Sequence, residues 1–150
     1  MRDILIFAIV LFVINGCGQN NNPVSTSDTI KSGSLEYTFS TSKSFYEAHD
    51  TLKAAVTVFN NGTSNDTIAV GDGIFQWNLQ NSKGQIIMFS GAFDNVVGLV
   101  TINPGQSKQI YTINQVIADT SGQAVNSGYY YLNASLRPSL SFSLKLSIQF

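Results

Sequence analysis

Residues 142–150 read Phe-Ser-Leu-Lys-Leu-Ser-Ile-Gln-Phe, an uninterrupted alternation of apolar and polar side chains. Successive side chains of a β-strand point to opposite faces of a sheet, so this segment predicts a strand with one buried face and one solvated face. On a helix the five apolar side chains would be scattered around the axis. The C-terminal segment therefore indicates a β fold.

The same alternation recurs from Leu35 onward, and turn-forming residues separate the alternating runs. The runs cover residues 35–39, 54–58, 75–79 and 130–136, and the intervening turns include 60–62, 71–73, 81–84, 103–105 and 126–128. Eight or nine short strands at this spacing predict an all-β sandwich or barrel of antiparallel sheets. Residues 75–90 predict a hairpin in which Gly84 adopts a positive φ. The segment 116–125 lacks alternation and is predicted to form a loop or one short helical turn.

The N-terminus predicts export. Residues 4–14 form an apolar run that follows Met-Arg-Asp and precedes Asn15-Gly16-Cys17. Eleven residues of helix span roughly 16 Å, too little for a hydrocarbon core of about 30 Å, whereas a signal peptide has this length. The order Ile14-Asn15-Gly16-Cys17 resembles a bacterial lipobox, which implies acylation of Cys17. The alternatives are an ordinary secretory signal or a buried apolar strand.

This interpretation divides the chain into three parts. Residues 1–16 are expected to be a signal peptide, residues 17–33 a lipid-anchored flexible tether, and residues 34–150 the folded domain. The tether is polar and turn-forming, so it cannot bury enough apolar area to offset its ordering entropy. The expected location is outside the cytoplasm: anchored by lipid at the outer membrane or cell surface, or on the periplasmic side.

Composition argues against nucleic acid as a partner. The formal net charge is −1 and only 11% of residues are charged. Nucleic-acid binding requires dense Lys and Arg to displace counterions from phosphates, and no basic stripe is present. With a single cysteine, the core has to hold by packing, without disulfides.

Four segments together resemble the intracellular proteinase inhibitor (BsuPI-type) family. They are residues 56–61, 75–88, 99–107 and 127–136, with a strand that ends in Asn61, a hairpin with Gly84 at its turn, a Pro104-Gly105 step and a Ser127-Gly128-Tyr129 strand start. The resemblance spans roughly residues 50–136 and implies an immunoglobulin-like β-sandwich. Gln106 stands where that family usually has Glu, and Ser127 where it often has Pro. The shared positions are turns and core residues, so no reactive-site residue carries over.

Few residues suggest catalysis or metal binding. His49 is the only histidine and lies in a polar stretch, where a loop position is expected, and the chain has no G-x-S-x-G nucleophile elbow. The loop carboxylates Asp66, Asp72 and Asp94 match no known calcium loop, so solvated turn residues are expected and neither a metal nor a cofactor is predicted.

An exposed tyrosine pair is the best candidate for binding. If Tyr130 and Leu132 face the core, then Tyr129 and Tyr131 face outward from the same strand, whereas Trp77 is expected inside the core. Exposed tyrosines offer large contact areas at low entropic cost. The alternative is that a loop such as 116–125 covers them. The sequence therefore predicts an exported lipoprotein with a non-enzymatic, protein-binding sandwich; a proteinase inhibitor of envelope or extracellular proteases is the alternative.

Overall fold

The computed structural model describes residues 26–71, 73–90, 97–119, 121–136 and 139–149, and all regular structure in these ranges is β-strand. The strands are β1 (Ser27–Ser32), β2 (Leu35–Thr41), β3 (Phe45–Glu47), β4 (Thr51–Asn60), β5 (Asp66–Val70), β6 (Phe75–Asn81), β7 (Ile86–Phe89), β8 (Gly98–Ile102), β9 (Ser107–Val116), β10 (Gly128–Leu136) and β11 (Leu140–Gln149). Within these ranges, no helix has the length and apolar character needed to cross a membrane.

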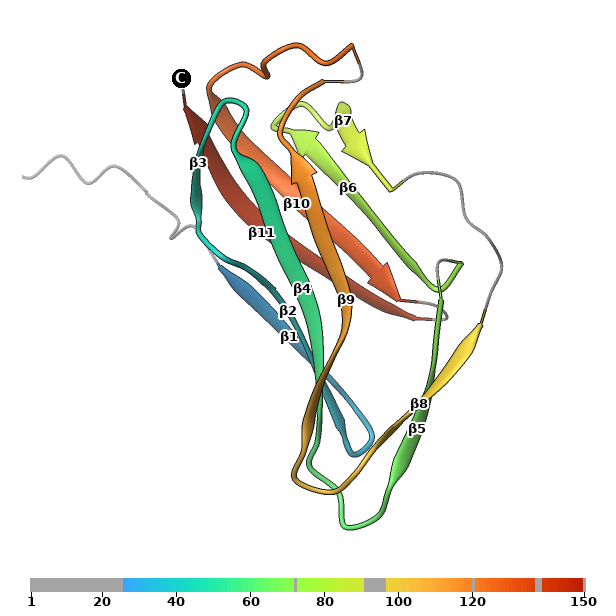
Figure 1. The fold of residues 1–150 in the computed structure, drawn as a ribbon. Helices are drawn as coiled ribbons and strands as arrows, with labels where there is room; N and C mark the ends of the chain where they lie inside the picture. Colours follow the sequence, from blue (N-terminus) through green and yellow to red (C-terminus); the bar gives the residue numbers. More distant parts are fainter. Residues whose placement is uncertain (1–25, 72, 91–96, 120, 137–138, 150) are drawn as a thin grey trace, which may run out of the picture.

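The strands form two packed sheets and a two-stranded ribbon (Figure 1). One sheet has the order β1-β2-β4-β9 and the other the order β3-β11-β10-β6-β7. Their facing sides bury one continuous apolar cluster that includes Phe39, Val56, Trp77, Leu132 and Leu144. The ribbon β5-β8 covers the remaining end of the first sheet, where Leu35, Val58 and Ile102 form a second cluster. The all-β sandwich predicted from the alternating runs is confirmed.

Two features of the core are typical of immunoglobulin-like sandwiches. Trp77 lies on β6 between the sheets, with 9% of its surface exposed. Tyr130, near the start of β10, donates a hydrogen bond from its hydroxyl to the carbonyl of Asn126, four residues upstream, at 2.7 Å. This contact corresponds to the tyrosine corner of that fold, and the order β11-β10-β6-β7 corresponds to its G, F, C and C′ strands. Burial raises the pKa of the Tyr130 hydroxyl.

The predicted register of the C-terminal strand is correct for its described part, and Phe150 lies outside the described residues. Phe142, Leu144, Leu146 and Ile148 are buried, and the side chains between them face solvent or lie at the surface. The predicted hairpin also forms, because β6 pairs with β7 and Gly84 in the connecting turn has a φ of 79°. The segment 116–125, where a loop or one short helical turn was expected, contains the last residue of β9 and then part of the connection to β10, without a helix in its described part.

The N-terminal boundary differs from the prediction. Ser27–Ser32 form β1, which pairs with β2 in antiparallel register, so the prediction of a tether over 17–33 is wrong for this segment. The backbone hydrogen bonds of this pairing stabilise a segment that is too polar to be held by hydrophobic burial alone. Ile30 also packs against the core. The described ranges hold eleven strands where the spacing predicted eight or nine, and one pairing, between β3 and β11, is parallel. The signal segment 1–16 and Cys17 lie outside the described residues.

Candidate functional site

The outer face of the five-stranded sheet carries most of the exposed apolar surface. Eight large apolar side chains are exposed in the described part of the chain, and five of them lie on this face: Phe45, Ile86, Phe89, Tyr129 and Tyr131. Single exposed apolar residues are ordinary on a protein surface, but a concentration on one face marks an interaction surface. This face is therefore the candidate functional site.

Three aromatic residues and one lysine form what we call the aromatic patch: Phe45, Tyr129, Tyr131 and Lys145. Tyr129 and Tyr131 are 45% and 39% exposed, as predicted from the alternation around Tyr130, and Phe45 is 43% exposed. Ser147 lies opposite both Tyr129 on β10 and Phe45 on β3, and its small side chain leaves the two rings uncovered. A shallow pocket of about 390 Å³ lies beside Tyr129 at the edge of the patch.

Lys145 links the two tyrosines. It lies directly opposite Tyr131 in the β10–β11 register, and its Nζ is 4.1 Å from the ring centroid of Tyr129. An ammonium over an aromatic ring at this distance makes a cation–π contact that restricts both side chains. The Tyr129 ring therefore has a cationic neighbour on the sheet before any partner binds.

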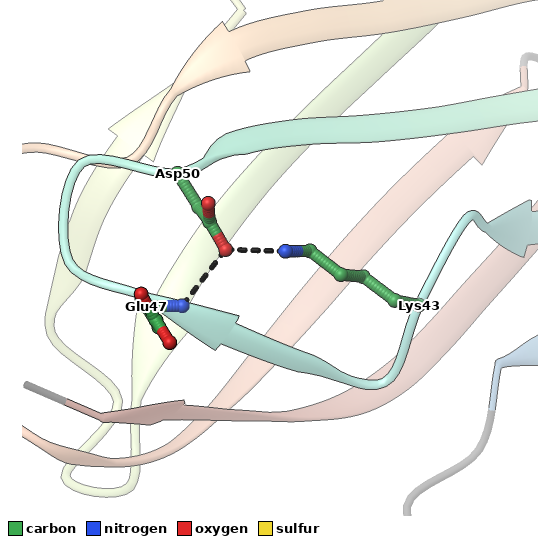
Figure 2. Close-up of polar contacts among 3 residues, drawn as sticks. All are labelled: Lys43, Glu47 and Asp50. Carbon is green, nitrogen blue, oxygen red and sulfur yellow. Dashed lines mark hydrogen bonds and ion pairs between the residues drawn. The ribbon is translucent and has the colours of Figure 1, made fainter.

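Asp50 connects the segment before β3 to the last residue of β3 (Figure 2). The Asp50 carboxylate accepts a hydrogen bond from the Lys43 ammonium, and the same oxygen, Oδ2, accepts one from the Glu47 backbone N–H at 2.9 Å. The Lys43 hydrogen bond, followed by that of the Glu47 N–H, lowers the pKa of the Asp50 carboxyl. These contacts close the turn from β3 to β4, and β3, which carries Phe45, pairs with β11.

A groove of about 880 Å³ occupies the other part of the same face. Its floor consists of neutral polar side chains from three strands, and Ile86 and Phe89 of β7 stand along one wall. Asp28 of β1 stands at the opposite wall, where its carboxylate accepts a hydrogen bond from the backbone N–H of Ser143 at 3.1 Å. The groove thus spans β11, β10, β6 and β7, which are neighbours in one sheet, and reaches β1 of the other sheet, which contacts β11.

The other residues considered from sequence take structural positions. His49 lies in the turn between β3 and β4 with a φ of 66°, a left-handed conformation that histidine adopts more readily than most residues. Asp66 accepts a hydrogen bond from the Ser34 hydroxyl, and burial, followed by the charge of Asp66, raises the pKa of Tyr37. No group of three or more His, Cys, Asp or Glu side chains with metal-binding geometry occurs among the described residues. Asp72 and Asp94 lie outside them.

Phe45, Ile86, Phe89 and the groove were not found from sequence. Ile86 and Phe89 are separated by Ile87 and Met88, which both pack against the core, because the β6–β7 register shifts after Leu79. Such a bulge breaks the two-residue period that the sequence reading depends on. Phe45 could have been recognised, since it alternates with the buried Tyr46, but a three-residue strand gives little signal.

Comparison with protein-family models gives no match, and comparison with curated proteins gives none either. Among solved structures, the chain is similar to a β-glucosidase from Listeria innocua at 14% identity, with 77% of this chain covered and a TM-score of 0.45. It is also similar to an alkylpurine DNA glycosylase from Pseudomonas fluorescens at 10% identity, with 73% of this chain covered and a TM-score of 0.46. The chain spans 16% of the former protein and 29% of the latter. Likenesses at this level carry no argument about activity.

Proposed function

We propose that this protein is an exported bacterial lipoprotein whose immunoglobulin-like sandwich binds another protein through the aromatic patch, without catalysis. The observation that carries the proposal is the side-by-side exposure of Tyr129, Tyr131 and Phe45 on one rigid sheet face. Tyrosines at the centre of an interface supply much of the binding energy because they bury large areas and lose few rotamers.

The rigidity of the patch favours binding. The strand that carries Phe45 is tied to the following turn by the Lys43–Asp50–Glu47 contacts, and Lys145 lies over the Tyr129 ring. A patch that is ordered before association loses less conformational entropy when it binds, so more of its contact energy appears as affinity. The cation–π contact also places one positive charge within the patch, which favours a partner with a carboxylate nearby.

The lipid anchor is the second part of the proposal, and it rests on the lipobox-like order before Cys17. Acyl chains contribute about 0.8 kcal/mol per buried CH₂, and lasting anchorage requires more than one chain. Expressed in a bacterial host, the protein should incorporate labelled palmitate and sediment with membranes, and Cys17→Ala should abolish both. A mature protein that begins at another residue would contradict the anchor while leaving the binding face untested by that result.

The binding face is tested by pull-down from native envelope with the lipidated protein. The double variant Tyr129→Ala, Tyr131→Ala should weaken capture of the partner at least about 30-fold, since the loss of even one interface anchor costs about 2 kcal/mol or more. The control is the double variant Leu99→Ala, Val116→Ala, which removes two exposed apolar side chains outside this sheet face. Equal capture by both variants would contradict the proposal.

Inhibition of a protease is the alternative function, because the sequence resembles the proteinase inhibitor family. A standard inhibitor presents a preformed loop and buries about 1,600 Å² against its protease. The full chain is expected to inhibit subtilisin-type proteases weakly or not at all. Nanomolar inhibition that survives the double tyrosine change would replace the proposed function with inhibition.

A further inference from the structure

The groove beside the aromatic patch has a floor built from amides and hydroxyls. Gln76 and Asn78 contribute from β6, Asn133 and Ser135 from β10, and Ser141 and Ser143 from β11. All six belong to the outward-facing set of their strands, because the residues between them are buried. The floor therefore presents these six side chains to a ligand, and the intervening residues Trp77, Ala134 and Phe142, whose side chains face the core, also line it.

Three of these side chains form a ladder across the sheet. The Ser143 hydroxyl donates to Asn133 Oδ1 at 2.8 Å, and Asn133 Nδ2 donates to Asn78 Oδ1 at 3.2 Å. Asn133 lies opposite Asn78 on one side and Ser143 on the other, so the strand register sets the ladder. The ladder fixes the amide orientations and leaves the Asn78 NH₂ group, with two donors, directed away from it.

The charge of the groove selects the class of ligand. Asp28 is the one charged residue among the described residues that line it, and its carboxylate already accepts the Ser143 backbone N–H. Among the described lining residues no cation is present to pair with an anionic ligand, and the one carboxylate that could pair with a cationic ligand is already engaged. The lining favours a neutral ligand that both donates and accepts hydrogen bonds at several closely spaced points.

Ile86 and Phe89 provide the apolar wall of the groove. Phe89 is 61% exposed and lies opposite Asn78 in the β6–β7 register, so its ring borders the amide floor. A wall of this kind covers the apolar side of a ligand while the floor pairs with its polar groups. Sugar rings have this dual character: hydroxyl groups, each both donor and acceptor, surround faces of C–H bonds that pack on aromatic rings.

We propose that the groove between Asp28 and Phe89 binds a neutral carbohydrate chain. Asn78, Asn133 and Gln76 pair with the sugar hydroxyls, and Phe89 packs against a ring face. This site is separate from the protein-binding aromatic patch, because none of its floor residues belongs to that patch. It does not depend on the proposed function.

The test is affinity electrophoresis of the full-length protein in detergent, through gels that contain soluble starch, dextran, xylan or galactomannan. Alginate serves as the anionic comparison, and an unfolded casein peptide is added as a competitor. Retardation by at least one neutral polysaccharide is expected. The dissociation constant should rise at least tenfold in Asn78→Ala and in Phe89→Ala.

Two controls keep the result specific. Asn114→Ala removes an exposed amide from β9 on the other sheet, and the double tyrosine variant removes the aromatic patch; both should bind the polysaccharide as the wild type does. Thermal melting of each variant verifies that it is folded. If no neutral polysaccharide retards the wild type, if retardation persists in the groove variants, or if alginate alone retards it, the proposal is wrong. Competition by the casein peptide would also overturn it and assign the groove to a polypeptide.

Discussion

Asn60 provides the sharpest test of how the sandwich is held together at its ribbon end. Its side chain is fully buried, and its Nδ2 donates to the carbonyls of Ser64 and Ile102, each at 2.8 Å. Its Oδ1 accepts the backbone N–H of Gly62, also at 2.8 Å. One amide therefore joins the end of β4, the turn toward β5 and the end of β8. We expect Asn60→Ala to destabilise the fold severely.

The magnitude follows from the three hydrogen bonds. Each contributes about 1 kcal/mol net, and the Ile102 carbonyl would stay buried without its partner, so the loss is about 3–5 kcal/mol. Typical domains have unfolding free energies of about 5–15 kcal/mol, so this is a large fraction of the total. Asn60→Asp should be worse at neutral pH, because a carboxylate oxygen would face the carbonyl oxygens of Ser64 and Ile102.

Urea denaturation followed by tryptophan fluorescence of Trp77 measures the effect. With a slope of about 1.5–2 kcal/mol/M, the midpoint should fall by about 2 M at an unchanged slope. The control is Asn61→Ala: Asn61 is exposed and donates only its backbone N–H, to the Ser34 carbonyl, so the change should stay within about 0.5 kcal/mol. A midpoint for Asn60→Ala close to that of Asn61→Ala would refute the assignment of Asn60 as the link.

Three further predictions concern the backbone, the register and a surface carboxylate. Gly62→Ala should destabilise the protein by about 1–3 kcal/mol, because the added Cβ would lie 2.8 Å from the Ser34 Cβ and 3.0 Å from Asn60 Oδ1. Gly98→Ala should be tolerated, because its Cβ would meet Val70 Cγ2 at 3.6 Å. Equal melting temperatures of the two variants would argue against close packing at the Gly62 turn. Ile148→Lys should unfold the domain, since an unpaired buried charge costs several kcal/mol. Gln149→Lys should be tolerated, because the lysine would lie opposite Glu47 on the solvent side. Circular dichroism distinguishes the two variants, and similar spectra would mean that the strand register is wrong. The Lys43 hydrogen bond and that of the Glu47 N–H lower the pKa of Asp50, so the Asp50 carboxylate stabilises the fold above the unfolded-state pKa of about 4 and loses this effect as pH falls through the lower folded-state pKa. The stability difference between wild type and Asp50→Asn should therefore shrink on acidification. A difference that grows toward low pH would contradict this prediction.

Sequence was sufficient wherever a strand keeps a strict two-residue period. The alternation in 142–150 assigns the buried face of β11 directly, and the buried Tyr130 and Leu132 fix the outward direction of Tyr129 and Tyr131. In these strands each side chain has one of two directions, and hydrophobicity selects between them. The core and the tyrosine pair of the candidate site were predictable for this reason.

Sequence was insufficient where pairing, rather than hydrophobicity, creates the structure. β1 is mostly polar and forms because β2 offers it an edge, and the bulge in β6–β7 turns both Ile87 and Met88 inward. The groove takes residues from five strands, among them Asp28 and Ser143, which are 115 residues apart. No local pattern encodes such a distance, so the groove appears only once the sheet order is known.

The inclusion of β1 in the sandwich changes how the two proposed surfaces relate to the anchor. The first described strand begins at Ser27, so nine residues, 18–26, separate it from Cys17, and a fully extended stretch of that length reaches at most about 30 Å. β1 also supplies Asp28, which pairs with the free Ser143 N–H of β11 and forms one wall of the groove. The segment that would connect the protein to the membrane is thus continuous with the strand that closes the sandwich beside the groove. A domain cut at residue 34 would lose the Asp28 wall, expose the edge of β2 and leave Ser143 N–H without its acceptor, so the smallest chain suited to binding measurements begins before Ser27.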